Sequence, residues 1–194
     1  MRIIDISREL SSCPPAPGFP EPVLEKKLEM KSGAPYNYTY VHACVHAATH
    51  CDAALHFVAD GQDIALSPLE HFIGMCYVHT VTPGRLVLPE DLQGIPQDAK
   101  RVLLHGNGTA CLSQEAALFL KERGVCTVGT DAFSVGAPEN DREVHVLLLS
   151  QGISIIENLK LDAVADGTYF LSAAPCKFDG AEAAFCRAVL ISDM

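Results

Sequence analysis

Alternation of apolar and polar residues predicts that β-strands make up most of this chain. Two early stretches, 2–7 and 23–30, alternate in this way, and 36–45 is rich in Tyr, Thr and Val and runs toward a group of histidines. Further strands are predicted at 75–81, 101–104, 126–128, 153–156, 169–174 and 185–191. The last two of these ranges are expected to close a sheet.

Two segments have helical spacing instead. Ser113 is suited to cap a helix whose apolar side chains recur at 116, 119 and 120, and Gly124 is suited to end it. A shorter helix is expected over 143–150, with Gly152 after it. Strands and helices are interspersed without a repeat or a flexible linker, so we expect a single α/β domain over residues 1–194 with a mixed sheet.

Composition excludes several classes of function. The apolar content of 48% predicts a real core, and the formal charge of −10 opposes nucleic-acid binding. No apolar run approaches the ~20 residues of a membrane span, and the N-terminus lacks a signal-peptide pattern, so we expect a cytoplasmic protein with no membrane partner. The eight cysteines are interpreted as reduced core residues rather than disulfides, because no secretion signal accompanies them.

The candidate chemistry is concentrated in residues 46–56. His46, His50, Asp52 and His56 lie within this short segment, among small side chains. His46 and His50 share one face of either a helix or a strand, and even spacing brings Asp52 to the same face of a strand. Imidazole and carboxylate are ligands for zinc, manganese and iron(II), so these donors predict a metal site. His42 is a candidate to support one of the ligands.

A second group of candidate ligands lies far downstream. Glu157 directly follows an apolar strand, and His145 lies on the predicted short helix before it. Strand ends commonly present ligands in α/β sheets, and a buried carboxylate there is costly unless it is paired or binds a cation. From spacing alone, a solvated Glu157 at the start of a loop is an equal alternative.

These motifs together resemble the cyclase-like metal hydrolases, which include bacterial kynurenine formamidase and isatin hydrolase. The resemblance rests on the spacing of the 46–56 motif and on the downstream histidine followed by Glu157-Asn-Leu. The opening Ile-Ile-Asp-Ile-Ser-Arg-Glu-Leu, the Pro-Gly loop and segments at 112–117 and 130–135 are also similar, so the resemblance covers nearly the whole chain. It implies an α/β fold around a barrel-like sheet, and a homodimer or homotetramer with active sites near subunit contacts.

The resemblance also implies a role for each candidate. The implied metal ligands are His46, His50, Asp52, His145 and Glu157. Asp52 and Glu157 would bridge two divalent ions, Zn²⁺ or Mn²⁺, and His56 would be a catalytic histidine that is not a ligand. The implied reaction is cleavage of a non-peptide amide of a small molecule, such as a formamide, a cyclic amide or an imide, by metal-activated water with His56 as general acid and base.

The sequence departs from the family at the expected substrate pocket. Ala48 and Ala54 stand where the family has Gly and Pro, and the chain contains no Trp. Ala16 corresponds to the family's substrate-facing tryptophan, and Phe19 is the candidate platform to replace it. We therefore expect an altered substrate pocket beside an intact metal centre.

Two other functions stay open from the sequence. Cys51, between His50 and Asp52, is a candidate thiol nucleophile if a neighbouring imidazole activates it. A non-catalytic relative that binds a metal or a small ligand would also tolerate the departures from the family. The spare His56 has no evident use in such a protein, which favours the enzyme.

Overall fold

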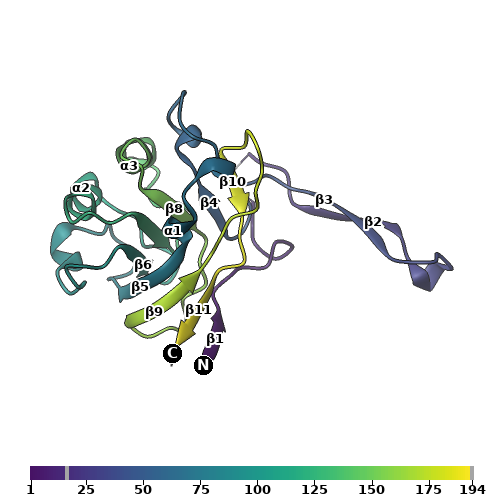
Figure 1. The fold of residues 1–194 in the computed structure, drawn as a ribbon, viewed down its shortest axis with the longest axis horizontal. Helices are drawn as coiled ribbons and strands as arrows, with labels where there is room; N and C mark the ends of the chain where they lie inside the picture. The colour runs from purple at the N-terminus through teal and green to yellow at the C-terminus, as the bar shows by residue number, and fades with distance from the viewer. Residues whose placement is uncertain (16–17, 193–194) are drawn as a thin grey trace.

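The computed structural model describes residues 1–15 and 18–192, and one long sheet dominates this part of the chain (Figure 1). Its strands lie in the order β1-β11-β9-β5-β6-β7-β8-β4-β10. In that order they are Arg2–Asp5, Val189–Ser192, Gly167–Ser172, Ile73–Thr80, Arg101–His105, Thr127–Thr130, Ser154–Glu157, His50–Asp52 and Ala183–Phe185. Strands β5 to β8 are parallel and the other pairs are antiparallel, so the predicted α/β fold with a mixed sheet is confirmed.

The sheet curls because two strands that are adjacent in sequence pair near its opposite ends. Strand β10 pairs with β4 at one end of the sheet, whereas β11 lies between β1 and β9 at the other. Residues 186–188 alone connect β10 to β11, and a connection of this length spans at most about 15 Å. A bridge between Ser7 and Leu159 further joins the segments that follow β1 and β8. The result is the curled, barrel-like sheet that the resemblance implies.

Two predicted strands differ from the structure by more than a shift of a few residues at their ends. The range 185–191 contains a break, because its two halves pair at opposite ends of the sheet. The range 36–45 is reduced to β3, Tyr38–His42, which pairs with β2, Val23–Leu28, in a separate two-stranded sheet. Figure 1 shows this hairpin projecting away from the body of the protein. We refer to residues 23–42, including the 3₁₀ turn Met30–Ser32, as the arm.

The two longer helices cover part of one face of the sheet. Helix α2, Gln114–Glu122, is capped by Ser113 as predicted, because the Ser113 Oγ accepts from the Ala116 backbone N–H at 3.1 Å. Helix α3, Asp141–Leu149, begins two residues before its predicted start, and a single turn, α1, covers Leu69–Phe72. Among the described residues, no helix is long and apolar enough to cross a membrane.

The core has two halves on opposite faces of the sheet. Val102 and Leu104 of β6 pack into a cluster with Leu120 and Leu148 from α2 and α3. Leu103, which lies between them in sequence, belongs to a second cluster with Ile156 on the other face. Because side chains alternate along a strand, the central strands are buried on both faces and hold a rigid frame for residues at their ends.

Candidate metal centre

Strand β4 presents two of the candidate ligands on one face. His50 and Asp52 are two residues apart, and Cys51 between them packs into the opposite core cluster. Strand β4 pairs with β8 so that His50 lies directly opposite Glu157, which brings Glu157 to the same face. The His50 Nε2 atom is 3.4 Å from both Asp52 Oδ1 and Glu157 Oε2. The backbone of this segment is therefore a strand and not a helix.

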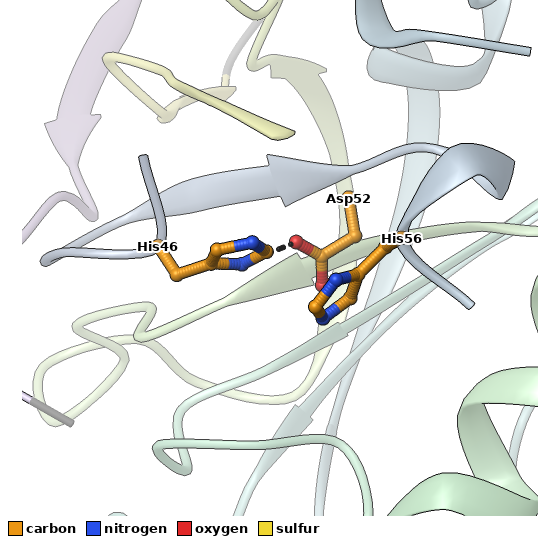
Figure 2. A group of neighbouring side chains, drawn as sticks. All are labelled: His46, Asp52 and His56. Atoms are coloured by element: carbon orange, nitrogen blue, oxygen red, sulfur yellow. Dashed lines mark ion pairs between the residues drawn. The ribbon is translucent and has the colours of Figure 1, made fainter. Parts of the chain in front are cut away.

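Two further histidines approach Asp52 from the flanking loops. His46 precedes β4, and His56 ends a short 3₁₀ turn, Ala54–His56. The His46 Nδ1 atom is 3.1 Å from Asp52 Oδ1, and the centroids of the His46 and His56 rings are 4.2 Å apart. Figure 2 shows both imidazoles turned toward the Asp52 carboxylate. These three residues form one group of donor atoms within 4.8 Å of one another, and His50, Asp52 and Glu157 form another.

Backbone carbonyls fix the orientation of the two most buried imidazoles. His145, on α3, donates from Nδ1 to the Asp141 carbonyl at 2.8 Å, and its Nε2 is 3.2 Å from Glu157 Oε1. His50 likewise donates from Nδ1 to the Ala48 carbonyl at 2.9 Å. A histidine that donates from Nδ1 carries its lone pair on Nε2 when it is neutral. Both rings therefore present Nε2 to the site, as metal-ligating histidines held by an outer partner do.

Several buried polar atoms at this site lie close to charged neighbours but make no hydrogen bond. They are Asp52 Oδ1, Asp52 Oδ2, His50 Nε2 and His145 Nε2. Such atoms are costly to bury, because desolvation is not compensated by a hydrogen bond. A divalent cation accepts lone pairs from carboxylate oxygens and from imidazole Nε2, so it would satisfy all of them. The donor set therefore fits a metal ion.

The electrostatics of the site also favour a bound cation. Burial lowers the pKa of His50, but the charges of Asp52 and Glu157 outweigh burial and raise this pKa well above its usual range. The same two carboxylates overcome burial at His145 and raise its pKa to about 9. Without a metal, the paired carboxylates thus attract protons to the two imidazoles. His56 differs, because burial and the neighbouring histidines lower its pKa despite the nearby carboxylates.

Other contacts at the site were not foreseen from the sequence. The Val135 backbone N–H donates to Glu157 Oε1 at 2.8 Å, and Glu182 Oε1 lies 3.2 Å from His46 Nε2. The Phe57 ring stacks on His145 with centroids 4.6 Å apart. Glu182 lies in a loop with no local pattern, and its place beside His46 depends on the pairing of β10 with β4. Of these residues, only Phe57 could have been singled out from the sequence, because it is an aromatic residue directly after His56.

The remaining candidates have different positions. Ala16 lies outside the described residues, and Phe19 is 52% exposed. His42 lies on the arm and contacts Glu25 at 3.0 Å, so the supporting role suggested for it is wrong. Cys51 faces away from the histidines, and burial raises the pKa of its thiol well above the usual range. The neutral, buried thiol argues against nucleophilic catalysis by Cys51.

Ala48 has the left-handed backbone conformation that glycine usually provides. Its φ is +54°, and it is buried immediately before Thr49 and β4. An L-residue in this region is held there by its surroundings at a cost of about 1–2 kcal/mol. The Ala48 carbonyl accepts from His50, so this conformation helps to orient a candidate ligand.

Comparisons with known proteins identify relatives over most of the chain. The profile of the cyclase family, described as putative cyclase, matches residues 4–137. A kynurenine formamidase from Erythrobacter litoralis (strain HTCC2594) is 34% identical over 97% of this chain and 93% of its own length.

Solved structures share the fold. A predicted metal-dependent hydrolase from Bacillus stearothermophilus has a TM-score of 0.81 and 26% identity over 97% of both chains. Isatin hydrolase A from Labrenzia aggregata has a TM-score of 0.84 and 22% identity, over 97% of this chain and 93% of its own. Because the family profile and a relative with more than 30% identity both cover most of its length, the chain belongs to the cyclase family.

Proposed function

We propose that this protein is a metal-dependent hydrolase that cleaves a non-peptide C–N bond in a small molecule. The observation that carries the proposal is the set of buried carboxylate oxygens and Nε2 atoms that converge without hydrogen-bond partners. The similarity to a kynurenine formamidase supports an amide as the bond that is cleaved. We propose a formamide, a cyclic amide or an imide as the substrate class.

We further propose that two divalent ions, Zn²⁺ or Mn²⁺, occupy the site. Asp52 belongs to both groups of donor atoms, which supports a bridging role for its carboxylate. Glu157 contacts both His50 and His145, which supports a second bridge. His46, His50 and His145 would complete the two ligand sets. A bound divalent ion supplies a Lewis acid that makes water nucleophilic near neutral pH.

The proposed general acid and base is His56. Its ring is half-buried and lies among the donors, with its centroid 4.2 Å from that of His46 and 5.5 Å from that of His145. In the reaction, His56 takes a proton from the attacking water and gives it to the leaving nitrogen. Phe57 packs against both His56 and His145 and restricts their rings.

The substrate pocket is proposed to differ from that of formamidases. The chain has no Trp, and the exposed Phe19 is the aromatic residue available in the loop where the family places one. A phenyl platform offers less stacking area than an indole. We therefore propose a smaller or less aromatic amide than kynurenine derivatives.

The test combines metal analysis with a substrate screen. Protein purified without chelator or affinity tag is expected to hold about two equivalents of zinc or manganese, and the loaded protein is screened against formamides, cyclic imides, lactams and lactones. Hydrolysis of an amide or imide that is lost on chelation and restored by the metal supports the proposal. A metal-loaded protein without amide or imide hydrolysis would overturn it and leave a binding protein of the same fold.

A pair of variants tests the role of His56. His56→Ala should lower turnover by about 100-fold or more while keeping the metal content, because general acid–base catalysis contributes roughly 10²–10⁴-fold. His79→Ala is the matched control, since His79 bonds to the Asp91 carbonyl and is no part of the donor set. Loss of metal from His56→Ala would show that His56 is a ligand.

A further inference from the structure

The His46 ring lies between two carboxylates, one at each nitrogen. Its Nδ1 atom is 3.1 Å from Asp52 Oδ1, the contact drawn as a dashed line in Figure 2, and its Nε2 atom is 3.2 Å from Glu182 Oε1. Asp52 is fully buried and belongs to both groups of candidate metal donors, whereas the Glu182 side chain is 40% exposed and belongs to neither. A neutral imidazole has one N–H, so it can donate to only one of the two carboxylates.

Hydrogen-bond geometry places this N–H at Nε2. The contact between His46 Nε2 and Glu182 Oε1 is a hydrogen bond, whereas Asp52 Oδ1 makes none despite its short distance from His46 Nδ1. A carboxylate can only accept, so His46 donates from Nε2 to Glu182 and carries its lone pair on Nδ1. His50 and His145 have the opposite arrangement, because both donate from Nδ1 to backbone carbonyls.

The backbone around Glu182 is tied to the segment that carries the metal donors. The Glu182 carbonyl accepts from the Ala53 N–H at 2.9 Å, and β10, which begins at the next residue, pairs with β4. On the other side, the Ala181 carbonyl accepts from the Ile64 N–H at 2.9 Å. The Glu182 carboxylate therefore extends from a backbone that is fixed relative to β4, unlike an ordinary surface ion pair between two long, mobile side chains.

We propose that Glu182 is a positioning residue of the metal centre, which accepts a hydrogen bond from His46 Nε2 and thereby directs His46 Nδ1 to the metal. This inference rests on the proposed metal centre, but it concerns a residue outside the ligand set. Metal-ligating histidines typically donate their other N–H to a carboxylate or a carbonyl, which fixes the ring and makes the ligand more basic. Backbone carbonyls have this function for His50 and His145, whereas His46 depends on a side chain.

The first test measures affinity for Zn²⁺ alone, by competition with a chelating dye, so it requires no substrate. In chelator-treated protein, Glu182→Ala should lower the affinity for one equivalent of Zn²⁺ by about 10- to 100-fold, as loss of such a partner typically does. Glu182→Gln keeps an oxygen that accepts from Nε2 and should retain most of the affinity. Asp179→Ala is the matched control, because it removes a like charge from an exposed position in the same loop.

The outcomes separate this inference from the proposed metal centre. A wild-type protein that binds no Zn²⁺ would overturn both. Zn²⁺ binding that is unchanged in Glu182→Ala would overturn the role of Glu182 and leave the metal centre intact. An equal loss in Glu182→Gln and Glu182→Ala, or a comparable loss in Asp179→Ala, would show that the negative charge acts at a distance, and it would also overturn the positioning role.

A second test observes the tautomer of His46 directly. In Zn²⁺-loaded protein labelled with ¹⁵N at histidine, couplings between the ring nitrogens and the carbon-bound ring protons show which nitrogen carries hydrogen. The signals that are absent from His46→Gln identify His46. We expect hydrogen on Nε2 of His46 but on Nδ1 of His50 and His145. Hydrogen on Nδ1 of His46 would overturn the proposal.

Discussion

Gly61 allows the close approach of the turn that carries His56, and its replacement tests how precisely His56 must be placed. A Cβ atom on Gly61 would lie 2.5 Å from the Ala54 carbonyl carbon and 2.7 Å from the Leu55 nitrogen. Ordinary contacts between such atoms begin near about 3.5 Å, so the backbone of the turn must retreat by about 1 Å. The turn cannot do so freely, because Leu55 donates to the Gln62 carbonyl at 3.0 Å.

We expect Gly61→Ala to lower kcat/KM by about 10- to 100-fold, since a displacement of about 1 Å at a reacting group has effects of this order. The metal content should stay unchanged, because the buried candidate ligands His50, Asp52 and Glu157 lie on strands. The assay is steady-state hydrolysis of an amide identified in the screen, together with elemental analysis.

Gly84→Ala serves as the control for this prediction. Gly84 has a φ of +78° and no atoms within 4 Å of an added Cβ, so the variant costs stability through the backbone without touching the site. An unchanged kcat/KM in Gly61→Ala, or an equal loss in Gly84→Ala, would refute the argument that Gly61 positions His56.

Three further predictions concern stability. In chelator-treated protein, the pKa of His145 is raised from 6.5 to about 9, so the stability gained from its protonated form is fully present below pH 6.5 and is lost as the pH rises toward 9. Urea titrations of this metal-free form should show a loss of about 3 kcal/mol over that range, and a flat profile would contradict the proton–carboxylate pairing. Ser113→Ala removes the cap of α2 and should cost about 1 kcal/mol, measured as a fall of the melting temperature by roughly 2–4 °C. Gly129→Ala places a Cβ 2.4 Å from the Leu103 side chain and should cost about 1–3 kcal/mol in urea; a neutral effect would mean that the core there is loosely packed.

Sequence patterns predicted the elements that depend on residues close together in the chain. The cap at Ser113 and the buried strand before Glu157 depend on neighbours in sequence, and both were found. The pairing of His50 with Glu157 depends instead on contacts between residues more than a hundred positions apart. No periodicity encodes such a register, so spacing indicated a metal site at 46–56, whereas the inclusion of His145 and Glu157 in it followed from the resemblance to a family.

The arm and the left-handed Ala48 show the other limit of sequence reasoning. The strand pattern of 36–45 was recognised, but the alternation of apolar residues does not tell which surface they meet. Alanine itself gives no sign of a positive φ, because it seldom adopts one, and only the glycine that the family has at position 48 pointed to this conformation. Both features depend on the tertiary structure, which local propensity does not contain.

The short connection between β10 and β11 has a consequence for how the protein is made. Residues 183–192 supply a strand to each end of the long sheet and are synthesised after every other strand. On the ribosome, the central parallel strands and their helices can assemble first, while β4, with two candidate ligands, waits for its outer neighbour. Nascent chains therefore expose an unpaired edge until residues 183–192 emerge, a state in which β-rich proteins are prone to aggregate.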